Sequence, residues 1–198
     1  MRLSITAFFF LVFSIMFTVS YAETTVCASS KTPKGFVVVR YGSSMSCPNW
    51  SPGRKNTKTI KLPGKTETVC TSSPIPKGFV VVRYGSQMSC PNWGPNRKNT
   101  KTIKLPRKIE TVCTSSPIPK GFVVVRYGSQ MSCPNWSPKR KNTKTIKLPG
   151  KVETVCTSSP IPKGVVVVRY GSHMGCPNWS PGRKNTKTIK KVRFKKVR

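Results

Sequence analysis

The sequence contains no aspartate, only four glutamates and a single histidine, His173. Most hydrolases use a paired general acid and base, and metal sites draw on the same side chains. The cysteines also form no Cys-x-x-Cys pair of the kind that indicates zinc. We therefore expect no enzyme activity, no metal, no cofactor and no small-molecule substrate.

Long apolar runs and helical periodicity are also lacking. The one apolar run, residues 7–17, follows the basic residue Arg2 and is followed by the small residue Ala22. It is shorter than the roughly 20 apolar residues of a membrane span. The pattern predicts a secretory signal peptide over 1–22, in preference to an uncleaved membrane anchor. The mature chain is then expected to be exported, with no integral membrane association.

What the chain does contain is one short unit repeated four times. A first cysteine recurs every 43 residues, at Cys27, Cys70, Cys113 and Cys156. A fixed period of this size indicates a tandem array of one small structural unit. We predict repeats over 23–65, 66–108, 109–151 and 152–190, and a basic tail over 191–198. The sequence leaves open how the repeats are arranged relative to one another.

Each repeat carries a second cysteine 20 positions after the first. Export exposes the chain to an oxidising compartment, and a self-contained unit with two cysteines most simply pairs them internally. Closing such a loop stabilises a small unit by about 3 kcal/mol. The predicted disulfides are Cys27–Cys47, Cys70–Cys90, Cys113–Cys133 and Cys156–Cys176.

The second repeat illustrates the expected fold of the unit. Residues 79–84, Phe-Val-Val-Val-Arg-Tyr, lie between two glycines and are β-branched or aromatic apart from the arginine, which predicts a strand. Its two faces are both apolar near the start, so we expect it to be the central strand of its sheet. Shorter strands are expected over 67–71 and 100–105, with a proline-containing loop over 72–78. The predicted class is mainly β, as four tandem disulfide-stapled modules.

Each repeat has one tryptophan, preceded by an asparagine. We expect Trp93 to cover the disulfide as part of the core, with stacking on a base or sugar as the alternative. The triplets at Asn49, Asn135 and Asn178 have the form of glycosylation acceptors, but a proline follows each triplet. We interpret the Asn-Trp pair as part of a turn.

Charge is strongly one-sided. The chain has 36 Lys and Arg against the four glutamates, for a formal net charge of +32. A solvated surface normally mixes both signs, whereas a surface of one sign attracts partners of the opposite sign. The composition therefore predicts a polyanionic partner, with DNA as the first candidate.

Every repeat carries the segment Arg-Lys-Asn-Thr-Lys-Thr-Ile-Lys, which places positive charge on both sides of a strand. Such a segment can follow a phosphate backbone without reading bases, so binding should be salt-dependent and weakly specific. The candidate nucleic-acid-binding residues are Arg54, Lys55, Lys58, Lys61, Arg97, Lys98, Lys101, Lys104, Arg140, Lys141, Lys144, Lys147, Arg183, Lys184, Lys187 and Lys190.

Two basic clusters are denser than the rest, and short basic runs of this kind are typical of nuclear localisation signals. The C-terminal cluster holds two consecutive Lys-Lys-x-Arg runs. A nuclear import receptor would be the corresponding partner. The candidate residues are Lys139, Arg140, Lys141, Arg183, Lys184, Lys190, Lys191, Arg193, Lys195, Lys196 and Arg198.

An export signal combined with nuclear signals resembles the layout of secreted gland effectors of plant-parasitic nematodes. The resemblance rests on residues 1–22 and 190–198. It implies release from the secretory gland and action in the nucleus of a host cell, on DNA and on defence-gene expression. Two alternatives account for the composition: an extracellular polyanion-binding or antimicrobial protein, and a structural or adhesive matrix protein.

Overall fold

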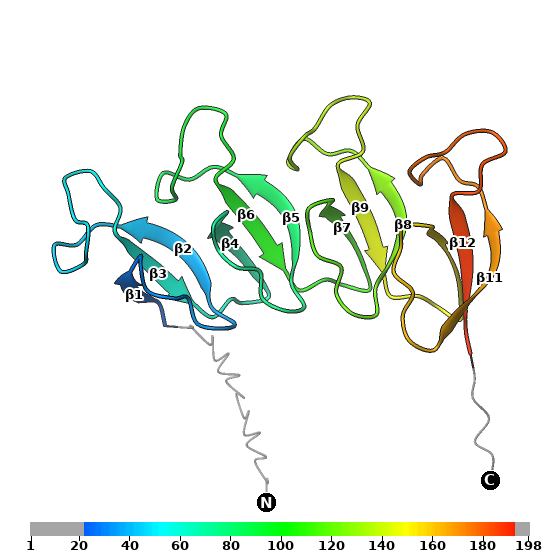
Figure 1. The fold of residues 1–198 in the computed structure, drawn as a ribbon, viewed down its shortest axis with the longest axis horizontal. Coiled ribbons are helices and arrows are strands. Elements are labelled where there is room, and N and C mark those ends of the chain that lie inside the picture. Colours follow the sequence, from blue (N-terminus) through cyan, green and yellow to red (C-terminus); the bar gives the residue numbers. More distant parts are fainter. Residues whose placement is uncertain (1–21, 193–198) are drawn as a thin grey trace, which may run out of the picture.

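The computed structural model describes residues 22–192, so the predicted signal sequence and most of the basic tail lie outside the described residues. All regular elements within this range are strands (Figure 1). In chain order they are β1 Thr24–Cys27, β2 Val37–Gly42, β3 Thr57–Lys61, β4 Thr66–Cys70, β5 Val80–Gly85, β6 Thr100–Lys104, β7 Ile109–Cys113, β8 Val123–Gly128, β9 Thr143–Lys147, β10 Val152–Cys156, β11 Val165–Gly171 and β12 Thr186–Lys191.

The strands form four antiparallel three-stranded sheets, one in each predicted repeat, which confirms the expected fold class. We call these modules 1 to 4. The third strand in sequence is the central one, as in the order β4-β6-β5. Our expectation that the Val-Val-Val strand would be central is therefore wrong. Both of its faces are apolar for a different reason, which lies in the packing between modules.

Because β4 and β5 both pair antiparallel with β6, they run in the same direction. The chain must therefore return from one end of the sheet to the other, and residues 71–79 make this crossover. The Lys101 Nζ holds the crossover in place by donating hydrogen bonds to the carbonyl oxygens of Thr71 at 2.9 Å and Ser73 at 2.6 Å. Gly78 adopts φ +90°, a left-handed conformation that favours glycine, just before β5 begins.

All four predicted disulfides are present and join cysteines within one module. Their Cα atoms are 5.4 Å apart in each case. Each bond joins the end of the first strand to the loop between the second and third strands. The disulfide therefore fixes both the start of the crossover and the base of that loop.

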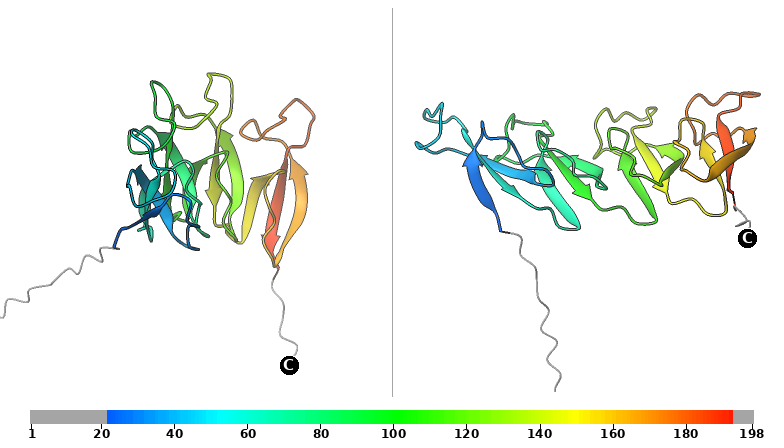
Figure 2. Two further views of the ribbon diagram at one scale, coloured as in Figure 1. Left: turned by 60° about the vertical axis from the view of Figure 1, so that its left-hand side comes forward. Right: turned by 60° about the horizontal axis from the view of Figure 1, so that its bottom comes forward.

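The modules pack against one another in an elongated row (Figures 1 and 2). Val37 of module 1 is fully buried among Val69, Phe79, Val81 and Ile103 of module 2. Equivalent clusters lie between modules 2 and 3 and between modules 3 and 4. The core is therefore shared between neighbours, as in repeat proteins in which each unit contacts only the next.

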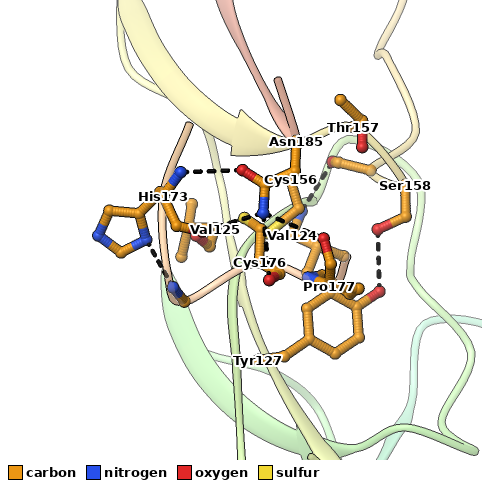
Figure 3. Close-up of a disulfide and its surroundings, with 12 residues drawn as sticks. Val124, Val125, Tyr127, Cys156, Thr157, Ser158, His173, Cys176, Pro177 and Asn185 are labelled. Atoms are coloured by element: carbon orange, nitrogen blue, oxygen red, sulfur yellow. Dashed lines mark hydrogen bonds between the residues drawn. A yellow bond between two sulfur atoms is a disulfide. The ribbon is translucent and has the colours of Figure 1, made fainter. Parts of the chain in front are cut away.

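Hydrogen bonds join the modules in the same way at each junction. At the second junction, Val81 N–H donates to Ser116 Oγ at 2.8 Å and Tyr84 N–H donates to the Ser132 carbonyl at 2.8 Å. The Tyr84 and Ser115 hydroxyls lie 3.0 Å apart. Figure 3 shows the third junction, where the hydroxyls of Tyr127 and Ser158 are 3.1 Å apart beside the Cys156–Cys176 disulfide.

Candidate nucleic-acid interface

Four long loops project from the same end of the four sheets (Figure 1). They connect the second and third strands of each module and span residues 43–56, 86–99, 129–142 and 172–185. We call them together the loop row. Each loop carries an exposed methionine, a partly exposed tryptophan and an exposed Arg-Lys pair. The array therefore presents the same group of side chains four times along its length.

A buried asparagine holds each loop in shape. In module 2, Asn99 Nδ2 donates to the carbonyl oxygens of Gln87, Cys90 and Pro91 at 2.9 to 3.0 Å, and its Oδ1 accepts from Gln87 N–H at 2.8 Å. Figure 3 shows the equivalent Asn185 of module 4. This asparagine belongs to the segment that the sequence predicts to follow a phosphate backbone. Because it is 3% exposed, its role is to order the loop.

The tryptophans lie on the loops and not in the core, so the expected core role of Trp93 is wrong. Trp93 is 50% exposed, and Trp50, Trp136 and Trp179 are 41 to 44% exposed. The preceding asparagine has a positive φ of 57° to 59° in all four modules, which confirms the turn interpretation of the Asn-Trp pair. The turn places the tryptophan on the loop surface, where the exposed part of its indole ring is available for stacking.

The arginines of the loop row are accessible to a partner. The side chains of Arg54, Arg97, Arg140 and Arg183 are exposed, and none makes a hydrogen bond or ion pair to another side chain within residues 22–192. Each follows the tryptophan of its loop by four positions. A guanidinium beside an aromatic ring can contact a phosphate while the ring stacks on a base.

The central lysines of the predicted binding segment are not accessible. Lys58, Lys101, Lys144 and Lys187 are only 6 to 8% exposed, and the Nζ of each donates to backbone carbonyls of its own crossover. The strand carrying them is covered by its neighbours, so it cannot follow a phosphate backbone. The prediction that these four lysines contact nucleic acid is corrected, because their ammonium groups serve the fold.

Because these lysines are buried, their contribution to the free energy of unfolding depends on pH. Desolvation lowers the pKa of Lys101, Lys144 and Lys187 below the ordinary value of 10.5. Between the lowered pKa and 10.5 the unfolded chain binds more protons than the folded one, so folding is favoured more strongly as pH rises. We expect the free energy of unfolding of the wild type minus that of Lys101→Met to increase from pH 8 to pH 10.5.

Urea unfolding at several pH values in that range would measure this difference. The matched control is Lys77→Met, which removes an exposed lysine from the same module. Its difference from the wild type should stay nearly constant with pH. A Lys101→Met difference that is flat or falls with pH would contradict the assignment.

Other predicted binding lysines take part in the junctions between modules. Lys104 Nζ lies 2.8 Å from Glu110 of the next module, and Lys61 and Lys147 make the equivalent ion pairs with Glu67 and Glu153. The exposed Lys98 donates to the Met131 and Cys133 carbonyls of module 3, and Lys55 and Lys141 repeat this contact. In module 4, Lys184 and Lys190 are exposed and make no such contact within residues 22–192.

A second arginine at each module escaped the sequence prediction. Arg83 lies at the end of β5 that leads into the loop row, and its Nε donates to Thr102 Oγ1 at 3.1 Å. Arg126 and Arg169 make the same contact, while Arg40 is also paired with Glu23 at 3.3 Å. The hydrogen bond fixes the guanidinium near the loops. The sequence does contain a signal for this arginine, because it is the one charged residue in the otherwise apolar strand Phe-Val-Val-Val-Arg-Tyr.

The predicted nuclear-localisation residues fall into three groups. Lys139, Arg140 and Lys141 are exposed in the third loop, and Arg183 and Lys184 are exposed in the fourth. Lys190 and Lys191 are exposed at the end of β12, so this strand continues one residue past the repeat boundary predicted at 190. Arg193, Lys195, Lys196 and Arg198 lie outside the described residues.

Comparisons with protein families, with characterised proteins and with solved structures found no match to this chain. The fold itself defines the class of the protein, which is a tandem array of disulfide-stapled β modules with a shared core. Within residues 22–192 no cluster of three or more His, Cys, Asp or Glu side chains is present. In the same range no helix is long and apolar enough to cross a membrane.

Proposed function

We propose that the protein is a secreted effector that binds nucleic acid through the loop row, by phosphate contacts and base stacking. The observation that carries this proposal is that each of the four loops presents an exposed arginine and a tryptophan that is 41 to 50% exposed, all along one side of the array. Positive charge along a backbone-tracking surface, combined with aromatic side chains, is the usual design for sequence-tolerant nucleic-acid binding. DNA is the partner we propose.

Repetition strengthens such binding without any new type of contact. Once one loop has bound, the others act at a high effective concentration if one strand of nucleic acid can reach them together. The junction hydrogen bonds and the shared cores support this geometry, because they hold neighbouring loops in a fixed relation. The affinity of the array should therefore greatly exceed that of a single loop.

We propose further that the target lies in the nucleus of a host cell, where binding alters defence-gene expression. Support comes from the exposed basic cluster Lys139, Arg140 and Lys141 and from the doubled Lys-Lys-x-Arg pattern that begins at Lys190. The third loop and the end of β12 both leave their lysines accessible to an import receptor.

Localisation of a fluorescent fusion tests this directly. Residues 23–198 fused to a fluorescent protein are expected to accumulate in plant nuclei. Alanine substitution of Lys190, Lys191, Arg193, Lys195, Lys196 and Arg198 should reduce that accumulation severalfold. The matched control replaces exposed lysines of the crossovers, Lys77, Lys120 and Lys163. Exclusion of the unmodified fusion from the nucleus would contradict the nuclear proposal.

A second candidate function is extracellular binding of acidic polysaccharide. The four disulfides favour it, because such bonds persist in an oxidising environment. Under this alternative the same loop row would bind sulfated or carboxylated chains. Heparin binding with nuclear exclusion of the fusion would favour this candidate over the first.

A further inference from the structure

The last module exposes an apolar face that every other module buries. Val37, Val80 and Val123 occupy one position of the repeat and are each 0% exposed, because the next module covers them. In module 4 the residue at this position is Val166, which is 47% exposed. Val168 and Tyr170 on the same strand are 52% and 57% exposed. We call these three residues of β11 the C-terminal face.

The same face carries polar groups that form junction contacts elsewhere. The N–H groups of Val38, Val81 and Val124 donate to a serine of the following module, and the lysine equivalent to Lys184 donates to its carbonyls. In module 4 the corresponding groups are Val167 N–H, Tyr170 N–H and Lys184 Nζ. Within residues 22–192 no module packs against this face, so these groups form the donor half of a junction.

The matching acceptor half is present at the other end of the chain. In modules 2 to 4 the surface that faces the preceding module presents four apolar side chains to the shared core. They are two valines, one isoleucine, and one phenylalanine that is replaced by valine in module 4. Module 1 has all four, as Val26, Phe36, Val38 and Ile60, and Val26 and Phe36 are only partly buried. We call the surface around Val26, Phe36 and Ser30 the N-terminal face.

The polar acceptors are retained as well. Ser30 occupies the position of Ser73, whose Oγ accepts from Val38 N–H at 2.8 Å. Ser29 and Ser46 occupy the positions of Ser72 and Ser89, which contact the Tyr41 hydroxyl and accept from Tyr41 N–H. The carbonyls that would receive Lys184 belong to Met45 and Cys47. Thus each type of junction hydrogen bond has both partners, one at either end of the chain.

Three substitutions make this terminal pair weaker than an internal junction. Lys31 and Thr32 replace Pro74 and Ile75, and Ile75 packs against an internal core. Thr24 stands at the position of Glu67, so Lys190 would lack the ion pair that Lys61 makes. The four apolar positions and the serine acceptors described above remain.

We infer that the mature protein associates head to tail, with the C-terminal face of one copy on the N-terminal face of a second copy. The occupant is a second copy because the chain contains this interface three times between its own modules. Such a contact is heterologous and does not close on itself when the modules follow in a row, so it produces linear chains. The loop row would then continue from copy to copy.

The high positive charge opposes this association, and this gives it a distinctive salt dependence. At low ionic strength the copies repel one another, since the chain carries a net charge of +32. At 1 M salt the Debye length falls to about 3 Å, while apolar burial is undiminished. Self-association should therefore increase with salt, whereas binding to a polyanion decreases.

Sedimentation velocity on residues 23–198 tests the inference. At 1 M NaCl the weight-average sedimentation coefficient is expected to rise with protein concentration, and at 0.05 M NaCl it should remain that of a monomer. Val168→Lys on the C-terminal face and Ser30→Arg on the N-terminal face should each abolish the rise. The matched control is Val152→Lys, at a 55% exposed valine on β10 at the other edge of the sheet from β11.

Mixing the two variants gives the decisive result. Val168→Lys retains an intact N-terminal face and Ser30→Arg retains an intact C-terminal face. Together they should form dimers and nothing larger, because only one productive contact is possible. A wild type that stays monomeric at 1 M NaCl overturns the inference. So does self-association of Ser30→Arg alone, which would indicate pairing of two C-terminal faces, or loss of association in Val152→Lys.

Discussion

Replacing Arg54, Arg97, Arg140 and Arg183 by serine is expected to lower the affinity of residues 23–198 for duplex DNA on the order of 10³-fold at 0.1 M salt. Each phosphate contact releases counterions worth about eightfold in affinity at that concentration, and four contacts multiply. These arginines are exposed on the loop row and are not held by other side chains of the described chain. Fluorescence anisotropy of a labelled duplex would measure the loss, together with a shallower dependence of log K on log salt.

The matched control removes four positive charges from the opposite end of the sheets. Lys34, Lys77, Lys120 and Lys163 are exposed in the crossovers, just before the second strand of each module. If the loop row is the interface, changing these lysines to serine should weaken binding far less than the arginine variant. Equal losses in the two variants would show that net charge alone governs binding, and the loop row would lose its special role.

A charge placed in a junction between modules should have the largest effect on stability. Val80 is fully buried among Val112, Phe122, Val124 and Ile146 at the junction of modules 2 and 3. The Val80→Asp substitution would bury a carboxylate without a partner, which we expect to cost at least about 4 kcal/mol. Coupling between the two halves of the array would be lost with it, because each module contacts only its neighbours.

Guanidinium unfolding followed by circular dichroism would measure this change. The wild type should unfold in one steep transition, whereas Val80→Asp should unfold earlier and over a broader range. Val152→Asp makes the same chemical change at an exposed valine and should alter the free energy of unfolding by less than about 1 kcal/mol. A similarly small effect of Val80→Asp would mean that the modules fold independently.

The sequence was sufficient to predict the disulfides and the repeated β module. Cysteine spacing and a fixed period are direct consequences of one unit folding around one covalent link, and β-branched runs between glycines define strands locally. The strand order was not predictable in the same way. A Val-Val-Val strand with two apolar faces can be central in one sheet or lie at the edge between two sheets, and here the second arrangement occurs.

Misassigned side chains at the site share a physical cause. Lys101 and Asn99 are residue types that often bind phosphate. Here Lys101 instead donates to backbone carbonyls of the crossover, and Asn99 donates to backbone carbonyls of its loop. Trp93 is a residue type that usually lies in a core. The core of its module is instead completed by a valine of the neighbouring module, and Trp93 stays on the loop, where it is 50% exposed. Local pattern does not reveal these outcomes, because they depend on contacts between segments far apart in sequence.

The most direct test of the proposed interface uses the protein's own fluorescence, since the four tryptophans all lie in the loop row. A single-stranded oligonucleotide is titrated into residues 23–198 at 0.05 M salt, and tryptophan emission and acrylamide quenching are recorded alongside the anisotropy of the labelled strand. The account predicts that binding changes the emission and protects the indole rings from acrylamide, and that added salt reverses both effects. Binding detected by anisotropy while emission and acrylamide quenching stay unchanged would contradict it.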